Sequence, residues 1–131
     1  MSGISECAQS VLLAGLESFG PFERRTTPDM VNHFAFAATQ KHADTLGKVA
    51  RSVLAAFTQG VLEASCQVPE SELNAVIVSL VSDFVADGVP GERIEAEVKE
   101  VRRTNSLVFL TADVTANGRI LLTANALAKR P

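Results

Sequence analysis

The fold of this chain is decided by one apolar stretch, GKVARSVLAAFTQGVLEASC, which runs from Gly47 to Cys66. Its apolar side chains recur at i, i+4, i+8 and i+12, and the neighbouring rows are filled as well. These positions are Val49, Val53, Leu54, Phe57, Val61, Leu62 and Ala64. Such a pattern predicts a long central helix over 47–66 that is buried on most of its circumference.

The residues after this helix have the apolar patterns of β-strands. We predict four strands there, separated by turns, over 73–85, 93–103, 106–115 and 120–128. The alternation slips near Glu100-Val101, which indicates a bulge. Asn117-Gly118 is typical of a type I′ hairpin turn, in which both central residues need positive φ.

Two further elements are predicted before the central helix. A short amphipathic helix is expected over about 5–18, and a strand with two apolar faces over 30–39. A helix buried among the strands of a following meander predicts an α+β fold in which one antiparallel sheet wraps the helix. Five strands leave an exposed sheet edge, which a second copy would protect, so we expect a homo-oligomer.

Length and composition limit the classes of function. The 131 residues suffice for one domain, 1–131, and 47% of them are apolar. The net charge of −3 and the absence of Trp and Tyr argue against nucleic acid or an anionic membrane as a partner. No secretory signal or membrane-spanning run is evident, so we expect a cytoplasmic protein.

The potential metal and redox ligands are few. Cys7 and Cys66 are not spaced as a redox pair and cannot form a zinc site alone, so reduced thiols are expected. His33 and His42 lack a third ligand. We therefore expect no metal and no cofactor.

Several segments, in order and at matching spacing, resemble the hotdog-fold thioesterases, and specifically their phenylacetate-pathway (PaaI-like) branch. These segments are GPFERR (20–25), DTLGKV (44–49), DFVADGVPGERIEA (83–96) and VTANGRIL (114–121). The resemblance implies a hotdog fold and hydrolysis of acyl thioesters of coenzyme A or of carrier proteins. It also implies a dimer or tetramer with its active site between subunits.

In that family the loop before the central helix ends in His-Gly-Gly, whose backbone N–H groups polarise the thioester carbonyl. A carboxylate nine residues after the His acts as base or nucleophile. Here Ala50 stands in place of the His, Arg51-Ser52 in place of the glycines, and Gln59 in place of the carboxylate. Ile77 stands approximately where the family has a strand hydroxyl.

One departure from the pattern adds a carboxylate. Asp44 takes the place of the Asn in the family's Asn-x-x-Gly loop, and the branch resembling 4-hydroxybenzoyl-CoA thioesterases carries its catalytic Asp in a similar loop. The resemblance therefore makes Asp44 the candidate base, and Gln59 would help to bind the thioester carbonyl. The candidates for binding the thioester carbonyl and the substrate are Gly47, Ala50, Arg51 and Ser52, and those for binding coenzyme A phosphates are Arg102, Arg103 and Arg119.

Each of these residues has a structural alternative. Asp44 could cap the central helix, and Gln59 could be a buried amide satisfied by backbone groups across the dimer. Arg51 could be solvated or form an ion pair between subunits. The sequence thus favours an acyl-CoA thioesterase with an altered site, and the alternative is a catalytically silent hotdog protein that binds an acyl or aromatic ligand or serves assembly.

Overall fold

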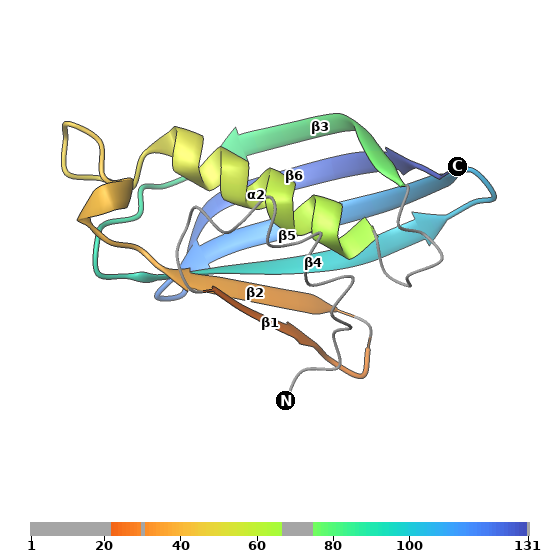
Figure 1. Ribbon diagram of the computed structural model, residues 1–131, viewed down its shortest axis with the longest axis horizontal. Coiled ribbons are helices and arrows are strands. Elements are labelled where there is room, and N and C mark those ends of the chain that lie inside the picture. The colour runs from red at the N-terminus through yellow and green to blue at the C-terminus, as the bar shows by residue number, and fades with distance from the viewer. Residues whose placement is uncertain (1–21, 30, 67–74, 131) are drawn as a thin grey trace.

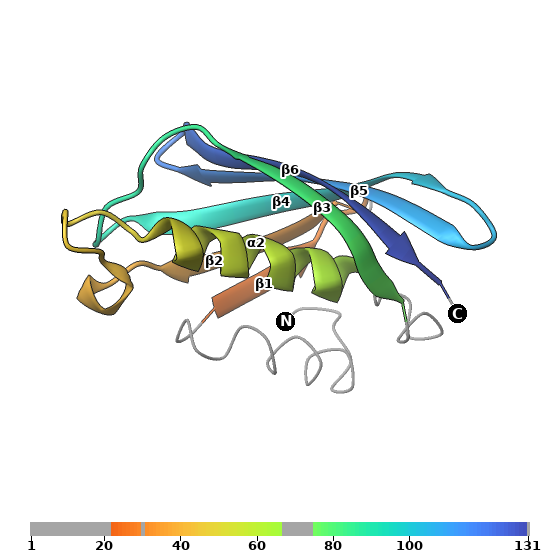
Figure 2. The same cartoon turned by 90° about the horizontal axis from the view of Figure 1, so that it is seen from above.

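The computed structural model describes residues 22–29, 31–66 and 75–130, and in this part of the chain one antiparallel sheet curves around one long helix (Figures 1 and 2). The fold is α+β, as predicted. The elements in chain order are β1 (Phe22–Thr26), β2 (Asn32–Ala37), the 3₁₀ turn η2 (Gln40–His42), α2 (Arg51–Cys66), β3 (Val76–Phe84), β4 (Arg93–Arg103), β5 (Leu107–Ala116) and β6 (Arg119–Lys129). The helix predicted over about 5–18 lies outside the described residues.

The strand order in the sheet is β1-β2-β4-β5-β6-β3, and every neighbouring pair is antiparallel. Within the described residues the sheet has six strands in place of the five predicted. The additional strand is β1, whose five residues include Glu23, Arg24 and Arg25 and so lack an apolar run. Its strand conformation depends on pairing with β2. Strands β1 and β3 form the two edges of the sheet.

The central helix begins at Arg51, four residues later than the predicted start at Gly47. Two backbone contacts hold the preceding residues outside the helix. Val49 forms a bridge with Ala43, and its N–H donates to the carbonyl of Gly88 at 2.8 Å. Gly47 has φ 77°, which suits glycine and interrupts a right-handed helix. The apolar periodicity therefore extends over residues 47–50, although these residues form a loop and are not part of the helix.

The core lies between α2 and the concave face of the sheet, where large aliphatic side chains surround a pair of phenylalanines. The rings of Phe36 and Phe57 meet edge to face with their centroids 4.7 Å apart, a favoured aromatic arrangement. Both side chains are essentially inaccessible to solvent. The helix is nevertheless open along one stripe, formed by Arg51, Ser52, Ala56, Gln59 and Glu63.

Two local predictions in the second half of the chain are confirmed. The pairing of β4 with β5 shifts register between Glu100 and Arg102, where the bulge was expected. Asn117 and Gly118 have φ values of 50° and 78°, the left-handed conformations of a type I′ turn. Within the described residues no helix is long and apolar enough to cross a membrane.

Candidate functional site

Asp44 closes the turn that precedes α2. Its Oδ1 accepts hydrogen bonds from the N–H groups of Leu46 at 2.9 Å and Lys48 at 3.1 Å. Its own N–H donates to the Lys48 carbonyl at 2.7 Å. Asp44 thus stabilises an exposed loop, and it does not cap the first turn of α2. Its second carboxylate oxygen accepts no hydrogen bond from any described residue, so it remains open to solvent or a ligand.

The four residues predicted to bind a thioester carbonyl differ in the state of their backbone N–H groups. The Gly47 N–H donates to the Asp44 carbonyl at 3.1 Å, and the Ala50 N–H donates to the His42 carbonyl at 2.9 Å. The N–H groups of Arg51 and Ser52 have no acceptor in the described part of the chain. They are the first two donors of a helix whose N-terminal end carries partial positive charge.

The Arg51 side chain lies against the turn that follows β3. Its guanidinium carbon is 5.3 Å from the centroid of the Phe84 ring, and its Nη2 is 4.0 Å from Oδ1 of Asp87. The Arg51 and Asp87 side chains are 62% and 45% exposed, so this ion pair is weak. Arg51 thus forms an exposed ion pair within one chain, whereas the structural alternative predicted from the sequence was a solvated side chain or an ion pair between subunits.

Gln59 lies on the open stripe of α2 and is exposed in the single chain. It is eight residues beyond Arg51, or about 12 Å along the helix axis. No hydrogen bond joins it to Asp44 within the described residues. Hence the two predicted catalytic side chains are not brought into direct contact by one copy of the chain.

Ile77 and the hydroxyl-bearing Ser82 lie toward opposite ends of β3. Ile77 pairs with Ala128 near the start of β3, at the end of the strand close to the C-terminus of α2 (Figure 1). Ser82 pairs with the buried Ala124, so it faces the helix side of the sheet. It lies two residues before Phe84, toward the N-terminal end of α2.

A partly buried ion pair that the sequence did not predict links the turn before β4 to the start of β6. Glu92 is 9% exposed, and its two oxygens accept from Arg119 Nη1 and Nη2 at 2.9 and 2.7 Å. They also accept from Asn117 Nδ2 at 2.7 Å and from the Val89 N–H at 2.8 Å. Arg119 Nη2 additionally donates to the Asp87 carbonyl at 2.8 Å.

These contacts strongly favour the charged form of Glu92. Hydrogen bonding from Arg119 outweighs the opposing effect of burial and lowers the pKa of Glu92 to about 2. Glu92 follows the Pro-Gly turn immediately before β4, and Arg119 follows the Asn-Gly turn at the start of β6. An antiparallel meander brings those two positions to the same end of the sheet, and this signal in the sequence could have predicted the pair.

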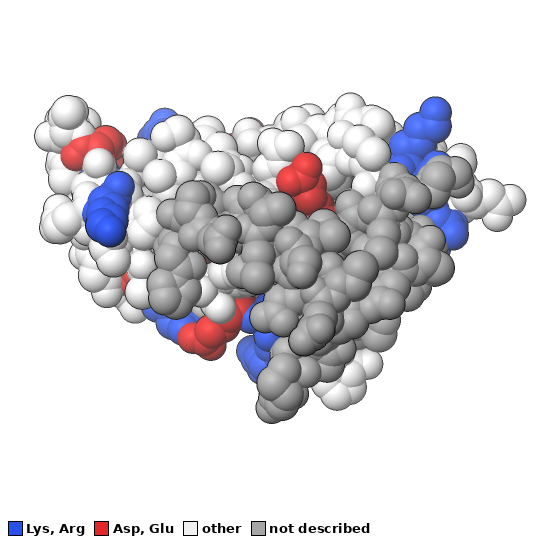
Figure 3. All heavy atoms as spheres, in the orientation of Figure 1, with Lys and Arg blue, Asp and Glu red and all other residues white. Residues whose placement is uncertain are grey.

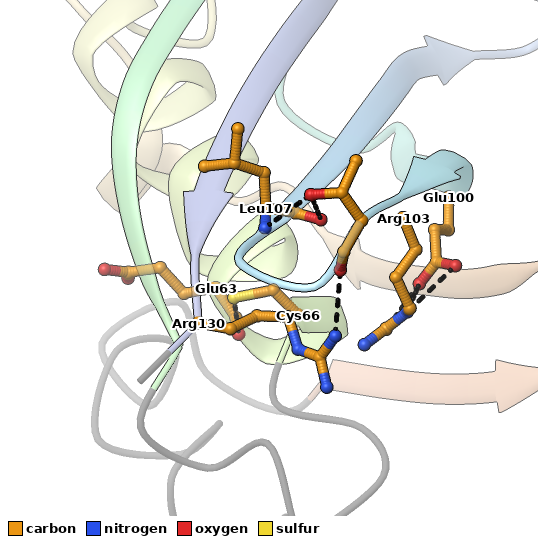
Figure 4. Close-up of polar contacts among 7 residues, drawn as sticks. Glu63, Cys66, Glu100, Arg103, Leu107 and Arg130 are labelled. Atoms are coloured by element: carbon orange, nitrogen blue, oxygen red, sulfur yellow. Dashed lines mark hydrogen bonds and ion pairs between the residues drawn. The ribbon is translucent and has the colours of Figure 1, made fainter.

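The three arginines predicted to bind phosphates are not brought together. Arg119 is engaged by Glu92 at the start of β6, whereas Arg102 and Arg103 lie at the far end of β4. Their register partners, Phe109 and the buried Val108, are consecutive residues of β5, so Arg102 and Arg103 point to opposite faces of the sheet. Arg103 forms an ion pair with Glu100 at 2.6 Å (Figure 4).

Other polar contacts at that end of the molecule are structural. The Cys66 thiol is buried and donates to the Glu63 carbonyl at 3.2 Å, and Arg130 Nη1 donates to the Thr104 carbonyl at 3.0 Å (Figure 4). Cys7 lies outside the described residues. On the side of the molecule that carries α2, the visible lysines and arginines are spread apart, with no dense basic patch among the described atoms (Figure 3).

The sequence matches no protein-family model and no curated protein. The structure, in contrast, is similar to many solved structures. It aligns with a hypothetical thioesterase from Streptococcus pneumoniae, solved with coenzyme A, at a TM-score of 0.83 and 11% identity, covering 94% of this chain and 95% of that one. The Escherichia coli PaaI protein gives 0.82 and 12%, covering 95% and 93%.

A mutant form of the phenylacetic acid degradation protein PaaI from Thermus thermophilus aligns at a TM-score of 0.78 and 19% identity, covering 88% of this chain and 97% of that one. The chain has the hotdog fold of these PaaI-like thioesterases. Identities this low establish the fold alone. What this hotdog protein does must therefore be argued from the residues of its own loop and helix.

Proposed function

We propose that this hotdog protein is an acyl-CoA thioesterase that binds the thioester carbonyl at the N-terminus of α2 and uses Asp44 as general base. The observation that carries the proposal is the pair of N–H groups on Arg51 and Ser52, which begin α2 directly after the Asp44 loop and have no acceptor among the described residues. Such donors stabilise an oxyanion as it forms. The solved complex of the S. pneumoniae thioesterase with coenzyme A supports this choice of substrate class.

The proposed reaction follows from the free groups of the site. Oδ2 of Asp44, which accepts no hydrogen bond from the described part of the chain, takes a proton from a water molecule while the water oxygen attacks the thioester carbon. The carbonyl oxygen becomes an oxyanion that accepts hydrogen bonds from the Arg51 and Ser52 N–H groups. When the intermediate collapses, the carbon–sulfur bond breaks and the departing thiolate receives the proton from Asp44.

The same proposal includes a second copy of the chain. Strand β3 pairs only with β6 among the described strands, and its opposite edge is unpaired there. Val76, Val78 and Val81 on this strand are 58%, 55% and 59% exposed. An apolar unpaired edge is a template for pairing with another strand. Pairing of β3 with its counterpart would cover these valines and leave Gln59, on the open stripe of α2, available to a partner's loop.

The test rests on a feature of the Asp44 loop. Both backbone donors converge on Oδ1 of Asp44, and the carbonyl oxygen of an asparagine can accept the same two bonds. Asp44→Asn therefore removes the base and keeps the loop, whereas Asp44→Ala removes both. Thiol release should be measured with short, branched, long and aryl acyl-CoAs. We expect Asp44→Asn to reduce kcat by roughly 10²- to 10⁴-fold with an unchanged melting temperature.

A catalytically silent binding protein is the second candidate, and Gln59 is the observation that favours it. An amide cannot act as a base at neutral pH, and it occupies the helix position where the family resemblance expects a carboxylate. If native protein is inert with every acyl-CoA but Gln59→Asp gains turnover, the site is an intact scaffold without its base. Calorimetric binding of a non-hydrolysable thioether analogue of acyl-CoA by an inert native protein would then support the binding role.

A further inference from the structure

Arg24 is a buried cation that has no charged partner among the described residues. Its side chain is 9% exposed, and its Nε and Nη1 are the only buried side-chain nitrogen or oxygen atoms in the described residues that make no hydrogen bond. Arg119, in contrast, has a carboxylate bound to both of its terminal nitrogens. Buried polar atoms in folded proteins are nearly always hydrogen-bonded, so Arg24 requires an explanation.

The register of the sheet explains why this side chain points inward. Arg24 pairs with the buried Phe34 across β1 and β2, and its guanidinium carbon is 5.2 Å from the centroid of that ring. The aromatic ring therefore covers one side of the guanidinium. The neighbouring Glu23 faces the opposite side of the sheet, where it pairs with Arg93 at 2.7 Å. The carboxylate closest in sequence is thus already engaged elsewhere.

The energetic cost of this arrangement is large. Burial lowers the pKa of the Arg24 guanidinium, and no carboxylate of the described residues acts to raise it, yet an arginine does not lose its proton in proteins. Leaving a buried charge unpaired is strongly destabilising, and the net stability of a folded protein is small. An apolar side chain at position 24 would avoid this cost and would pack against Phe34 as well as arginine does.

We propose that Arg24 is the anchor of an anion site on the α2-facing side of the β1 edge, and that its ligand is a small carboxylate. A planar carboxylate accepts hydrogen bonds from guanidinium N–H groups, and its single negative charge leaves the buried pair neutral. A phosphate dianion would leave a net charge in the same place. The site lies at the sheet edge opposite β3, so it is separate from the β3 edge at which we propose dimerisation and does not depend on the proposed thioesterase activity.

The proposal is tested on the native protein by NMR of the arginine Nε–Hε groups. Arg24 is assigned with Arg24→Lys, which retains the charge and lacks the guanidinium. Sodium acetate replaces sodium chloride at constant ionic strength, and inorganic phosphate is titrated in parallel. We expect the Arg24 resonance to move saturably with acetate, and the melting temperature to rise by about 5 °C at tenfold excess over Kd.

Matched variants decide between a specific site and a general salt effect. Arg24→Met should be at least as stable as the native protein in chloride and should lose the acetate dependence, whereas Arg25→Met, on the exposed face of the same strand, should retain it. Three outcomes overturn the proposal. These are an acetate effect that persists in Arg24→Met, a response to phosphate alone, and an Arg24 Nε–Hε that is already protected in chloride and unchanged by acetate.

Discussion

Replacing Glu92 with glutamine should destabilise the protein by about 2 kcal/mol at pH 7. Glutamine keeps the size of the side chain but presents one acceptor and one donor group where four donors now converge. The fall in the pKa of Glu92 from 4.5 to about 2 corresponds to at most roughly 3.5 kcal/mol, at ~1.4 kcal/mol for each pKa unit. Because the Arg119 side chain is 40% exposed, solvent screens part of this interaction, which gives the lower figure.

The effect of pH has a definite sign. Folding depresses the pKa of Glu92, so its stabilising contribution is fully present above about pH 4.5 and is lost as the pH falls from there toward 2. Urea denaturation of the native protein and of Glu92→Gln at pH 7, 4 and 3, at one protein concentration, measures this contribution. The difference in the free energy of unfolding should be largest at pH 7 and should narrow steadily toward pH 3.

Glu95→Gln provides the control on the same strand. Glu95 is exposed and approaches only the exposed Arg93 among the described residues, at 3.3 Å, so its replacement should change stability by less than about 0.5 kcal/mol. Two results would refute the reasoning about Glu92. One is a Glu92→Gln variant as stable as the native protein at pH 7, and the other is a stability difference that stays constant down to pH 3.

Three further predictions concern packing, the turn and the sheet edge. Gly88→Ala should cost about 1–3 kcal/mol in thermal unfolding, because its Cβ would lie 3.1 Å from a fully buried leucine methyl group. Equal stability would show that the core yields there. Asn117→Gly should lower the free energy of unfolding by about 1 kcal/mol, because the hydrogen bond to Glu92 is lost. Asn117→Ala should lower it by about 1 kcal/mol more, because residue 117 has φ 50°. Equal losses for the two variants in urea denaturation would contradict this. Val81→Lys should shift light-scattering mass toward the monomer, whereas Val101→Lys, equally exposed at 60% but on an interior strand, should not.

Local chemistry accounts for the parts of the fold that the sequence predicted well. The strand over 93–103 and the bulge near Glu100 follow from alternation and its interruption, and Asn117-Gly118 follows from the rarity of residues that accept positive φ. These signals depend on residues close together in the chain. For the same reason the apolar periodicity located the central helix and its last residue, Cys66.

The tertiary structure decided the features that depend on contacts between distant residues. Helix α2 starts at Arg51 and not at Gly47 because the Val49 N–H donates to the Gly88 carbonyl. Strand β1 forms because its charged residues pair with β2. No local pattern contains either contact.

The same division applies to the site. The sequence identified Asp44, Arg51 and Ser52 as residues that accompany the helix N-terminus. Only the folded chain determined that one oxygen of Asp44 is used by its own loop and that Arg119 is bound to Glu92. Residue types and spacing determine which groups are present, whereas hydrogen bonds between segments far apart in the chain determine which of those groups remain available for chemistry.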